Sequence, residues 1–176
     1  MSHLGLCKTI NTTMELTKRM SSYLPVLIKT VLETKGPILE MGAGPFSTPV
    51  LHWLCSKNRR TLVTCENNSE SYAFAKQFQS RNHKIVLVKD WDEVTAGDTH
   101  WSVVLIDHAP EFRRPVEAIK FKNNADYIVL HDTEEKNEHI YNYNSVWSHF
   151  RYRYDYDFCS PRTTVVSNFK DPVKIF

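Results

Sequence analysis

The sequence predicts a three-layer α/β fold, in which helices cover both faces of a doubly wound, mostly parallel β-sheet. Two features predict it: short runs rich in Val, Ile and Leu recur along the chain, and segments with helical spacing separate most of them. The runs are apolar at successive positions, which is typical of strands covered on both sides. We interpret residues 1–176 as a single domain, with a helical segment at 1–35 and an α/β core at 36–176.

Five of these runs are expected to form the parallel part of the sheet. They are Ile38–Met41, Thr61–Glu66, Lys84–Val88, Ser102–Asp107 and Tyr127–His131. The segment RYRYDYDF, residues 151–158, instead alternates aromatic and charged residues, which predicts a strand with one exposed face. A last strand is expected at Thr163–Ser167, and the short link before it leaves no room for a crossover helix. The sheet is therefore expected to carry an antiparallel strand near the C-terminus.

Helices are expected before and between the strands. Apolar residues recur at helical spacing over residues 13–34, and Pro25 is expected to divide this segment into two helices. Thr48 is a candidate cap for a helix with Pro49 at its first position, and another helix is expected to begin at Asn68 or Ser69. Tyr72, Ala75 and Phe78 are expected along one face of the latter helix.

Two further helices are expected in the second half of the chain. One covers 115–122, with Val116 and Ile119 facing inward. The other covers 137–150, where Ile140, Tyr143, Trp147 and Phe150 form one stripe.

The composition is that of an ordinary globular protein. With 41% hydrophobic residues, 24% charged residues and a net charge of +2, it lacks the basic character typical of nucleic-acid binding. The four cysteines fit no zinc spacing, and Cys65 is expected to be a buried thiol. No stretch is apolar and long enough for a secretory leader or a membrane span. We therefore expect a cytoplasmic protein that binds neither nucleic acid nor membranes.

Acidic side chains mark the C-terminal end of every predicted parallel strand. In chain order these ends carry Glu40 with Gly42 and Gly44, then Glu66, Asp90-Trp91, Asp107-His108 and His131-Asp132. In a doubly wound fold, ligands bind at this edge of the sheet. The acids therefore predict a ligand site rather than a row of solvated charges.

The stretch ILEMGAGPFSTPVL, residues 38–51, predicts a nucleoside-cofactor site. Gly42 and Gly44 permit a tight turn and close approach of a ligand, and Glu66, about 20 residues on, is placed to bind ribose hydroxyls. A dinucleotide site would carry a third glycine at position 47, which is Ser47 here. Glu40 is expected to face a cationic group of the ligand.

These motifs resemble those of class I S-adenosylmethionine-dependent methyltransferases, over residues 37–132. The resemblance implies a Rossmann-like fold with an antiparallel seventh strand, and S-adenosyl-L-methionine as cofactor. Asp90 and Trp91 resemble the pair that contacts the adenine, and Asp107 resembles the residue beside the methyl donor. Pro45 and Phe46 depart from the pattern, because many members carry smaller residues there. The implied cofactor-binding residues are Glu40, Gly42, Ala43, Gly44, Ser47, Thr48, Glu66, Asn67, Asp90, Trp91 and Asp107.

The expected reaction is methyl transfer to a small-molecule acceptor through its hydroxyl group. A hydroxyl acceptor benefits from a general base, and His108 or His131 is the candidate, with Asp107 or Asp132 orienting it. These four residues are the predicted catalytic set. The compact chain suits a small acceptor, or a homo-oligomer that completes the site.

The same strand ends offer candidate ligands for a divalent metal. LIDHAPEFRRP and IVLHDTEE are similar to segments of small-molecule and sugar O-methyltransferases whose fourth and fifth strands end in metal-binding acids. Asp107 and Asp132 suit Mg²⁺, but His131 is a poor third ligand and Glu134 is the remaining candidate. We assign no metal. Arg113 and Arg114 could bind an acidic acceptor, but we expect them in a solvated loop.

Three other functions remain open at this stage. One is a nicotinamide-dependent oxidoreductase, against which the missing third glycine counts. Another is a catalytically inactive regulatory protein that keeps the nucleoside pocket. The last is a related enzyme that uses the same cofactor for other chemistry, such as aminopropyl transfer.

Overall fold

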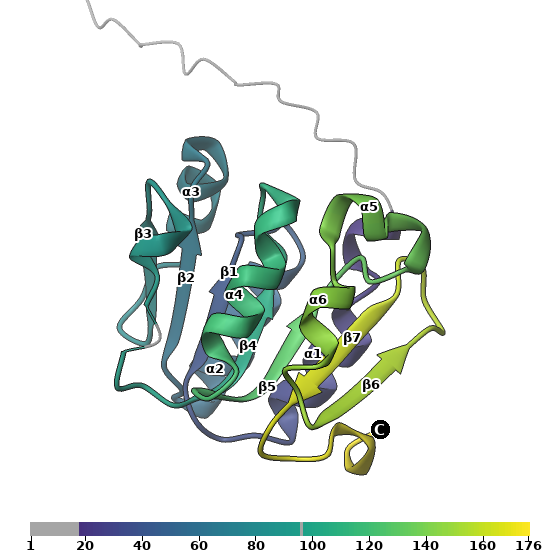
Figure 1. Ribbon diagram of the computed structural model, residues 1–176. Helices are drawn as coiled ribbons and strands as arrows, with labels where there is room; N and C mark the ends of the chain where they lie inside the picture. Colours follow the sequence, from purple (N-terminus) through teal and green to yellow (C-terminus); the bar gives the residue numbers. More distant parts are fainter. Residues whose placement is uncertain (1–17, 96) are drawn as a thin grey trace, which may run out of the picture.

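The computed structural model describes residues 18–95 and 97–176, and its described part is built on one seven-stranded sheet (Figure 1). The strand order is β3-β2-β1-β4-β5-β7-β6. Strands β1 to β5 are parallel to one another, whereas β7 is antiparallel to both β5 and β6. The strands are β1 Ile38–Met41, β2 Leu62–Glu66, β3 His83–Leu87, β4 Trp101–Ile106, β5 Ala125–Leu130, β6 Tyr152–Tyr156 and β7 Thr163–Ser167. The predicted fold class is confirmed.

Short helices and 3-10 turns (η) connect the strands. The α-helices are α1 Leu24–Leu32, α2 Ser47–Asn58, α3 Ser69–Lys76, α4 Arg114–Phe121, α5 Glu138–Tyr141 and α6 Asn144–Trp147. The 3-10 turns are η1 Lys18–Ser21, η2 Trp91–Glu93, η3 Glu111–Arg113, η4 Glu135–Asn137 and η5 Pro172–Lys174. Pro25 lies in the first turn of α1, and the break between η1 and α1 comes before it, at residues 22–23. Residues 13–17 of the predicted N-terminal helix lie outside the described residues.

Two hydrophobic layers cover the two faces of the sheet. Neighbouring residues of a strand enter opposite layers: Ile38 packs in the layer that contains α1 and α2, and Leu39 in the layer that contains α4 and α6. Figure 1 shows α4 and α6 in front of the sheet and α1 and α2 behind it. All four residues of β1 are buried, as expected for a central strand.

Several local predictions need correction. Val116 on α4 is 48% exposed, and the buried positions of that helix are Arg114, Pro115, Glu117, Ala118 and Phe121. The single helix predicted for 137–150 is a 3-10 turn and two short helices, because Asn142 adopts a left-handed conformation with φ 54°. Ile140 is consequently 45% exposed. The half-exposed strand predicted for 151–158 is confirmed as β6, where burial alternates.

No helix in residues 18–95 or 97–176 is long and apolar enough to cross a membrane.

Candidate functional site

The turn after β1 is the first part of the site, and Gly42 lets it form. Gly42 has φ +97°, and a Cβ there would lie 2.5 Å from the carbonyl oxygen of Asp107 and 2.7 Å from Cα of His108. Gly42 is thus required because the chain leaving β4 passes close to it. The sequence instead predicts the close approach of a ligand at this position. Gly44 differs, because it lines a cavity together with Ala43 and Pro45. The turn therefore joins the ends of β1 and β4 and offers one side to a ligand.

Glu40 lies beneath this turn and holds it. Its side chain is fully buried, and its carboxylate accepts hydrogen bonds from Thr48 (3.1 Å to each oxygen) and Thr64 (2.6 Å). The Thr48 hydroxyl oxygen accepts the Gly44 N–H at 3.1 Å. Burial raises the pKa of Glu40 to about 7, although hydrogen bonds from Ser47, Thr64 and Thr48 oppose the rise. The sequence predicts that Glu40 faces the ligand; in the structure, Glu40 instead supports the turn from below.

Thr48 and Ser47 belong to this support rather than to a helix cap. Helix α2 begins at Ser47, and the residue before it, Phe46, makes no side-chain cap. The predicted capping role of Thr48 is therefore wrong. The Thr48 hydroxyl donates to Glu40 rather than capping the helix. A buried carboxylate without hydrogen-bond donors would cost more free energy than an uncapped helix start. Both residues are buried; Thr48 accepts a hydrogen bond from the turn, and Ser47 donates one to Glu40.

A row of hydrogen bonds continues from Glu40 toward the surface. The Thr64 hydroxyl oxygen lies 2.8 Å from His83 Nε2, and His83 Nδ1 lies 3.1 Å from Nδ1 of the partly exposed His52. Because the Thr64 hydroxyl gives its proton to Glu40, His83 donates from Nε2. Burial, followed by the charge of His52, lowers the pKa of His83 to about 4. His83 is therefore neutral near pH 7.

Glu66 ends β2 and also contacts the turn. Its carboxylate accepts hydrogen bonds from the backbone N–H groups of Ala43 (2.6 Å), Asn67 (2.8 Å) and Asn68 (2.7 Å). Asn68 in turn caps α3, since its side chain accepts the N–H groups of Glu70 and Ser71. This confirms that the helix starts at the Asn68–Ser69 step. Glu66 thus lies where the sequence placed it, beside the glycine turn at the C-terminal edge of the sheet.

The predicted adenine-side residues form a packed group beyond Glu66. Trp91 is 2% exposed, stacks on His108 at a centroid distance of 4.1 Å, and donates its Nε1–H to the carbonyl of Ala109 at 2.8 Å. The side chain of Asn67 donates to the same carbonyl at 3.0 Å. Asp90 is exposed and accepts the N–H of Asp92. Asp90 and Asn67 are therefore reachable from outside, whereas the Trp91 ring lies beneath.

His108 lies away from the acids near which the sequence placed it. Its Nε2 is 3.8 Å from Oε2 of the buried Glu117, and its ring does not line the main cavity. Burial lowers the pKa of His108 to about 3, and the charge of Arg114 acts in the same direction. His108 is consequently neutral near pH 7, and it does not line the cavity.

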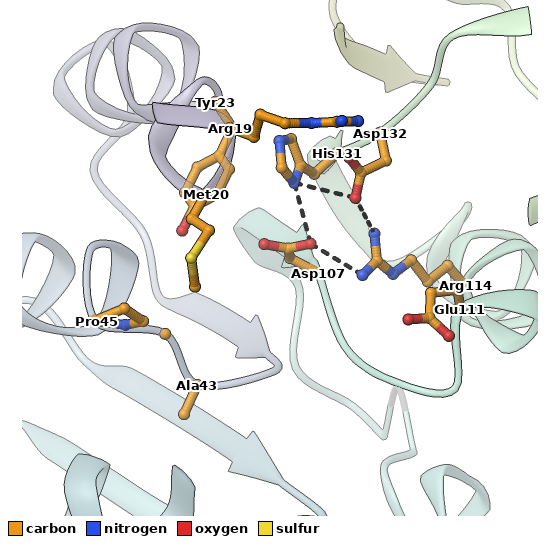
Figure 2. Close-up of a pocket in the computed structure, with 11 residues that line it drawn as sticks. Arg19, Met20, Tyr23, Ala43, Pro45, Asp107, Glu111, Arg114, His131 and Asp132 are labelled. Atoms are coloured by element: carbon orange, nitrogen blue, oxygen red, sulfur yellow. Dashed lines mark hydrogen bonds and ion pairs between the residues drawn. The ribbon is translucent and has the colours of Figure 1, made fainter. Parts of the chain in front are cut away.

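The cavity itself has a volume of about 400 Å³ and connects the turn to the ends of β4 and β5. Figure 2 shows the turn residues on one side, acidic residues on the other and the N-terminal segment above. Its lining residues are Arg19, Met20, Tyr23, Ala43, Gly44, Pro45, Asp107, Glu111, Arg114, His131 and Asp132. Of the predicted site residues, those that meet in this space are Ala43, Gly44, Asp107, His131 and Asp132.

Arg114 organises the acidic side of the cavity. Its guanidinium lies 3.1 Å from Asp107 and 3.3 Å from Asp132, and it donates to the carbonyl of His108 at 2.7 Å. Arg114 is buried, so the expectation of a solvated loop is wrong for this residue. Burial raises the pKa of Asp107, but the charge of Arg114, followed by the hydrogen bond from His131, holds it below its usual value. Asp107 is therefore ionised near pH 7.

His131 completes this group. Its Nδ1 lies 3.2 Å from Oδ1 of Asp107 and 3.4 Å from Oδ2 of Asp132, as the dashed lines of Figure 2 show. Asp132 follows β5 in a left-handed conformation with φ 59°, and its carboxylate also accepts the hydroxyl of Tyr141 at 2.9 Å. The unusual backbone turns the Asp132 side chain back toward the cavity.

The same three residues form the candidate cation cluster of the described chain. One ligand atom each from Asp107, His131 and Asp132 lie within 4.8 Å of one another, whereas Glu134, the third ligand considered from sequence, is not among them. Two carboxylates and an imidazole nitrogen suit a divalent cation. Arg114, however, already supplies a positive charge to both carboxylates. We therefore assign no metal.

The sequence predicts that the N-terminal helices and the loop after Asp132 form any lid over the site, but it identifies no lining residue on the N-terminal side. Arg19 and Met20 from η1, and the buried Tyr23 before α1, cover the acids from above (Figure 2). No spacing along the chain connects these residues to β5. The sequence does contain a signal for Arg114. An arginine that closely follows a strand ending in an acid is placed to form an ion pair with that acid.

Comparisons with known proteins agree with this fold. No protein-family model matches the sequence, and no curated protein matches it significantly. Among solved structures, spermidine synthase from Thermotoga maritima has a TM-score of 0.64 at 12% identity over 89% of this chain and 62% of its own. The N-terminal domain of human METTL16, in complex with SAH, has a TM-score of 0.62 at 11% identity over 88% of this chain and 72% of its own.

A third structure is similar over most of both chains. The human methyltransferase 10 domain containing protein has a TM-score of 0.61 at 11% identity, over 87% of this chain and 83% of its own. At these identities the likeness establishes the fold, a mixed sheet of the kind found in methyltransferases. The chain spans less than two thirds of the length of the spermidine synthase.

Proposed function

We propose that this protein is an S-adenosylmethionine-dependent methyltransferase that acts on a small molecule with a hydroxyl acceptor group. One observation carries the proposal: the glycine turn after β1 and the Asp107–His131–Asp132 group line a single cavity. A methyl donor on the turn and an acceptor beside the acids would therefore be neighbours. A related fold in complex with SAH and another with the transition-state analogue AdoDATO support the cofactor class.

The cofactor would lie along the C-terminal edge of β1, β2 and β4. In this proposal Glu66 binds the ribose by exchanging some of its backbone hydrogen bonds for hydroxyl donors, while Asn67 and Asp90 flank the adenine. Ala43 and Gly44 border the methionine portion, and Asp107 attracts its positive charge. Glu40 and Thr48 support the turn from below, and Trp91 supports the adenine side.

The acceptor would lie between Asp107, His131 and the N-terminal segment. The bound cofactor would supply a methyl group on a positively charged sulfur, so positioning provides much of the acceleration. His131 is the proposed base, because it lines the cavity and His108 does not. Asp107 and Asp132 orient its ring, and Arg114 keeps both carboxylates in place. A cavity of about 400 Å³ is in the range of small-molecule sites.

Calorimetric titration with S-adenosylhomocysteine, and with NAD for comparison, tests the cofactor class. We expect binding of S-adenosylhomocysteine alone. Glu66→Ala should abolish it, whereas Glu70→Ala, an exposed acid on α3, should leave it unchanged. Binding of NAD instead would support a nicotinamide-dependent oxidoreductase. Unchanged affinity of Glu66→Ala for S-adenosylhomocysteine would refute the proposed contact between Glu66 and the ribose.

A screen of hydroxyl and amine acceptors with labelled cofactor tests the reaction. We expect methylation of a hydroxyl compound, and a loss of roughly 100-fold or more in turnover for His131→Gln with unchanged S-adenosylhomocysteine affinity. His139→Gln, an exposed histidine on α5, is the matched control. Cofactor binding without turnover on any acceptor would favour the inactive regulatory protein. Transfer of an aminopropyl group would favour the chemistry of the spermidine synthase fold.

The remaining features of the proposal concern partners and location. We propose a cytoplasmic protein that binds neither nucleic acid nor membranes, because the net charge is only +2 and acids line the cavity. A homo-oligomer is compatible with the exposed Phe112 and Ile140 on η3 and α5. Sedimentation analysis would determine the oligomeric state.

A further inference from the structure

The N-terminal segment contributes a buried serine to the environment of His131. Ser22, between η1 and α1, is 6% exposed, and its hydroxyl oxygen lies 2.9 Å from Nε2 of His131, a residue 109 positions away. This nitrogen is opposite to Nδ1, which faces Asp107 and Asp132. His131 is thus held at both ends of its ring.

The remaining contacts of Ser22 determine which atom donates. The hydroxyl oxygen lies 2.8 Å from the carbonyl oxygen of Pro161 and 3.3 Å from that of Arg19, and both carbonyls only accept. A hydroxyl has one proton. If Ser22 gave it to His131, the carbonyl of Pro161 would face an oxygen lone pair at 2.8 Å in a buried place. Ser22 therefore donates to Pro161 and accepts the Nε2–H of His131.

The carboxylates on the other side of the ring favour the opposite tautomer, with the proton on Nδ1. The contact with Ser22 is therefore needed to hold the proton on Nε2. Two carboxylate oxygens, at 3.2 Å and 3.4 Å from Nδ1, would attract an N–H to that nitrogen in a neutral ring. The ring of Tyr23 packs edge-on against His131 at a centroid distance of 4.7 Å and prevents the imidazole from turning away. The hydrogen bond to Ser22 is the contact that keeps the neutral-ring proton on Nε2.

We propose that Ser22 is a positioning residue: it fixes the Nε2–H tautomer of His131 and so leaves Nδ1, beside Asp107 and Asp132 at the wall of the cavity, as the proton-accepting nitrogen. The assignment of Nδ1 as the base rests on the proposed function, whereas the tautomer does not. In the reaction, the acceptor oxygen forms its bond to the methyl carbon as the carbon–sulfur bond breaks. The hydroxyl proton passes to Nδ1, where Asp107 and Asp132 stabilise the resulting imidazolium.

Two-bond ¹⁵N–¹H correlation NMR of the imidazole rings tests the tautomer without any ligand. Spectra of ¹⁵N-labelled full chain are recorded at a pH where the His131 ring is neutral, and His131→Gln identifies its signals. We expect the Nε2–H tautomer in the wild type, a shift toward Nδ1–H in Ser22→Ala, and the wild-type pattern in Ser22→Thr, which keeps the hydroxyl. An Nδ1–H tautomer in the wild type, or an unchanged pattern in Ser22→Ala, would overturn the proposal.

The wild-type spectrum decides the question even if Ser22→Ala does not fold. Once an acceptor is found, Ser22→Ala should lower kcat about tenfold while the affinity for S-adenosylhomocysteine stays within about twofold, and Ser22→Thr should restore kcat. Calorimetry separates the two proposals. If wild-type protein binds no S-adenosylhomocysteine, the proposed function fails, while the NMR result still stands for the tautomer.

Discussion

The carboxyl group of Glu40 is a buried acid whose protonation changes near neutral pH. Its pKa is about 7 in the folded chain against 4.5 ordinarily, so the folded state keeps a proton that the unfolded state releases over this interval. Stability from this group is therefore greatest below pH 4.5 and falls as the pH rises to about 7. The change is on the order of 3 kcal/mol, from the size of the pKa shift.

Glu40→Gln provides the control for this prediction. The amide keeps the shape of the side chain and cannot ionise, so its free energy of unfolding should lack this pH dependence. Urea unfolding of both proteins between pH 4.5 and 8 gives the difference, in which the titrations of all other groups cancel. We expect the free energy of unfolding of the variant to increase relative to that of the wild type as the pH rises. A constant difference would show that Glu40 is ionised throughout.

Individual site residues differ in how far the sequence could locate them. Glu66 and Asp107 were placed correctly, because the end of a parallel strand fixes the edge at which a side chain emerges. His108 is next to Asp107 in the chain, yet it leaves on the other side and stacks on Trp91. Which of two adjacent residues faces a cavity depends on the backbone after the strand, and no pattern in the sequence encodes it.

Among the structural elements, the turn after β1 should be the most sensitive to a single methyl group. Gly42→Ala adds a Cβ 2.5 Å from the backbone of Asp107 at φ +97°, so either β1 or the end of β4 must move. We expect a loss of about 3 kcal/mol or more in the free energy of unfolding, together with loss of S-adenosylhomocysteine binding. Denaturant unfolding and calorimetry measure the two effects.

Gly97→Ala is the matched control, because Gly97 also has a positive φ, +54°, but nothing lies within 4 Å of its added Cβ. The left-handed conformation alone costs about 1–2 kcal/mol. Equal losses in the two variants would mean that backbone conformation, and not the contact between β1 and β4, explains the need for Gly42.

The start of α3 connects helix stability to the position of Glu66. The Asn68 side chain caps the helix through the N–H groups of Glu70 and Ser71, while its own N–H binds Glu66. Asn68→Ala should lower the free energy of unfolding by about 1 kcal/mol, and Asn68→Ser, which keeps a capping oxygen, should lose much less. Thermal unfolding followed by circular dichroism compares them. An equal loss in both variants would argue against the cap.

Helices were predicted less well than strands, for a physical reason. The stripe from Ile140 to Phe150 satisfies helical spacing, but Asn142 takes a left-handed conformation that ends α5 and lets Tyr141 reach Asp132. In α4, the buried face contains Arg114 and Glu117, so charges replace the apolar residues that periodicity detects. Tertiary contacts overrode the local pattern in both segments: a hydrogen bond from Tyr141 to Asp132 in the first, and ion pairs of Arg114 with Asp107 and Asp132 in the second.

For the whole molecule, the order of apolar runs predicts a mostly parallel sheet with an antiparallel strand near its end, whereas the residues that close the site are not predictable. The sheet follows from right-handed crossovers between buried strands, a rule that needs only local patterns. Closure depends on contacts such as Ser22 with His131, which join segments 109 residues apart. Nothing in the spacing of the N-terminal segment indicates which strand it will cover.

The cavity combines residues of the N-terminal segment with residues that follow β1, β4 and β5, so a ligand there should stabilise the whole fold. If S-adenosylhomocysteine binds the native state alone, a concentration of about 100 times Kd adds about 2.7 kcal/mol. For a chain of this size that corresponds to a rise of roughly 5–10 °C in Tm. Differential scanning calorimetry should show one transition that moves as a unit, because Tyr23, the turn and Asp132 share the site. A second transition that does not move with ligand would instead identify a part of the chain that unfolds independently of the site.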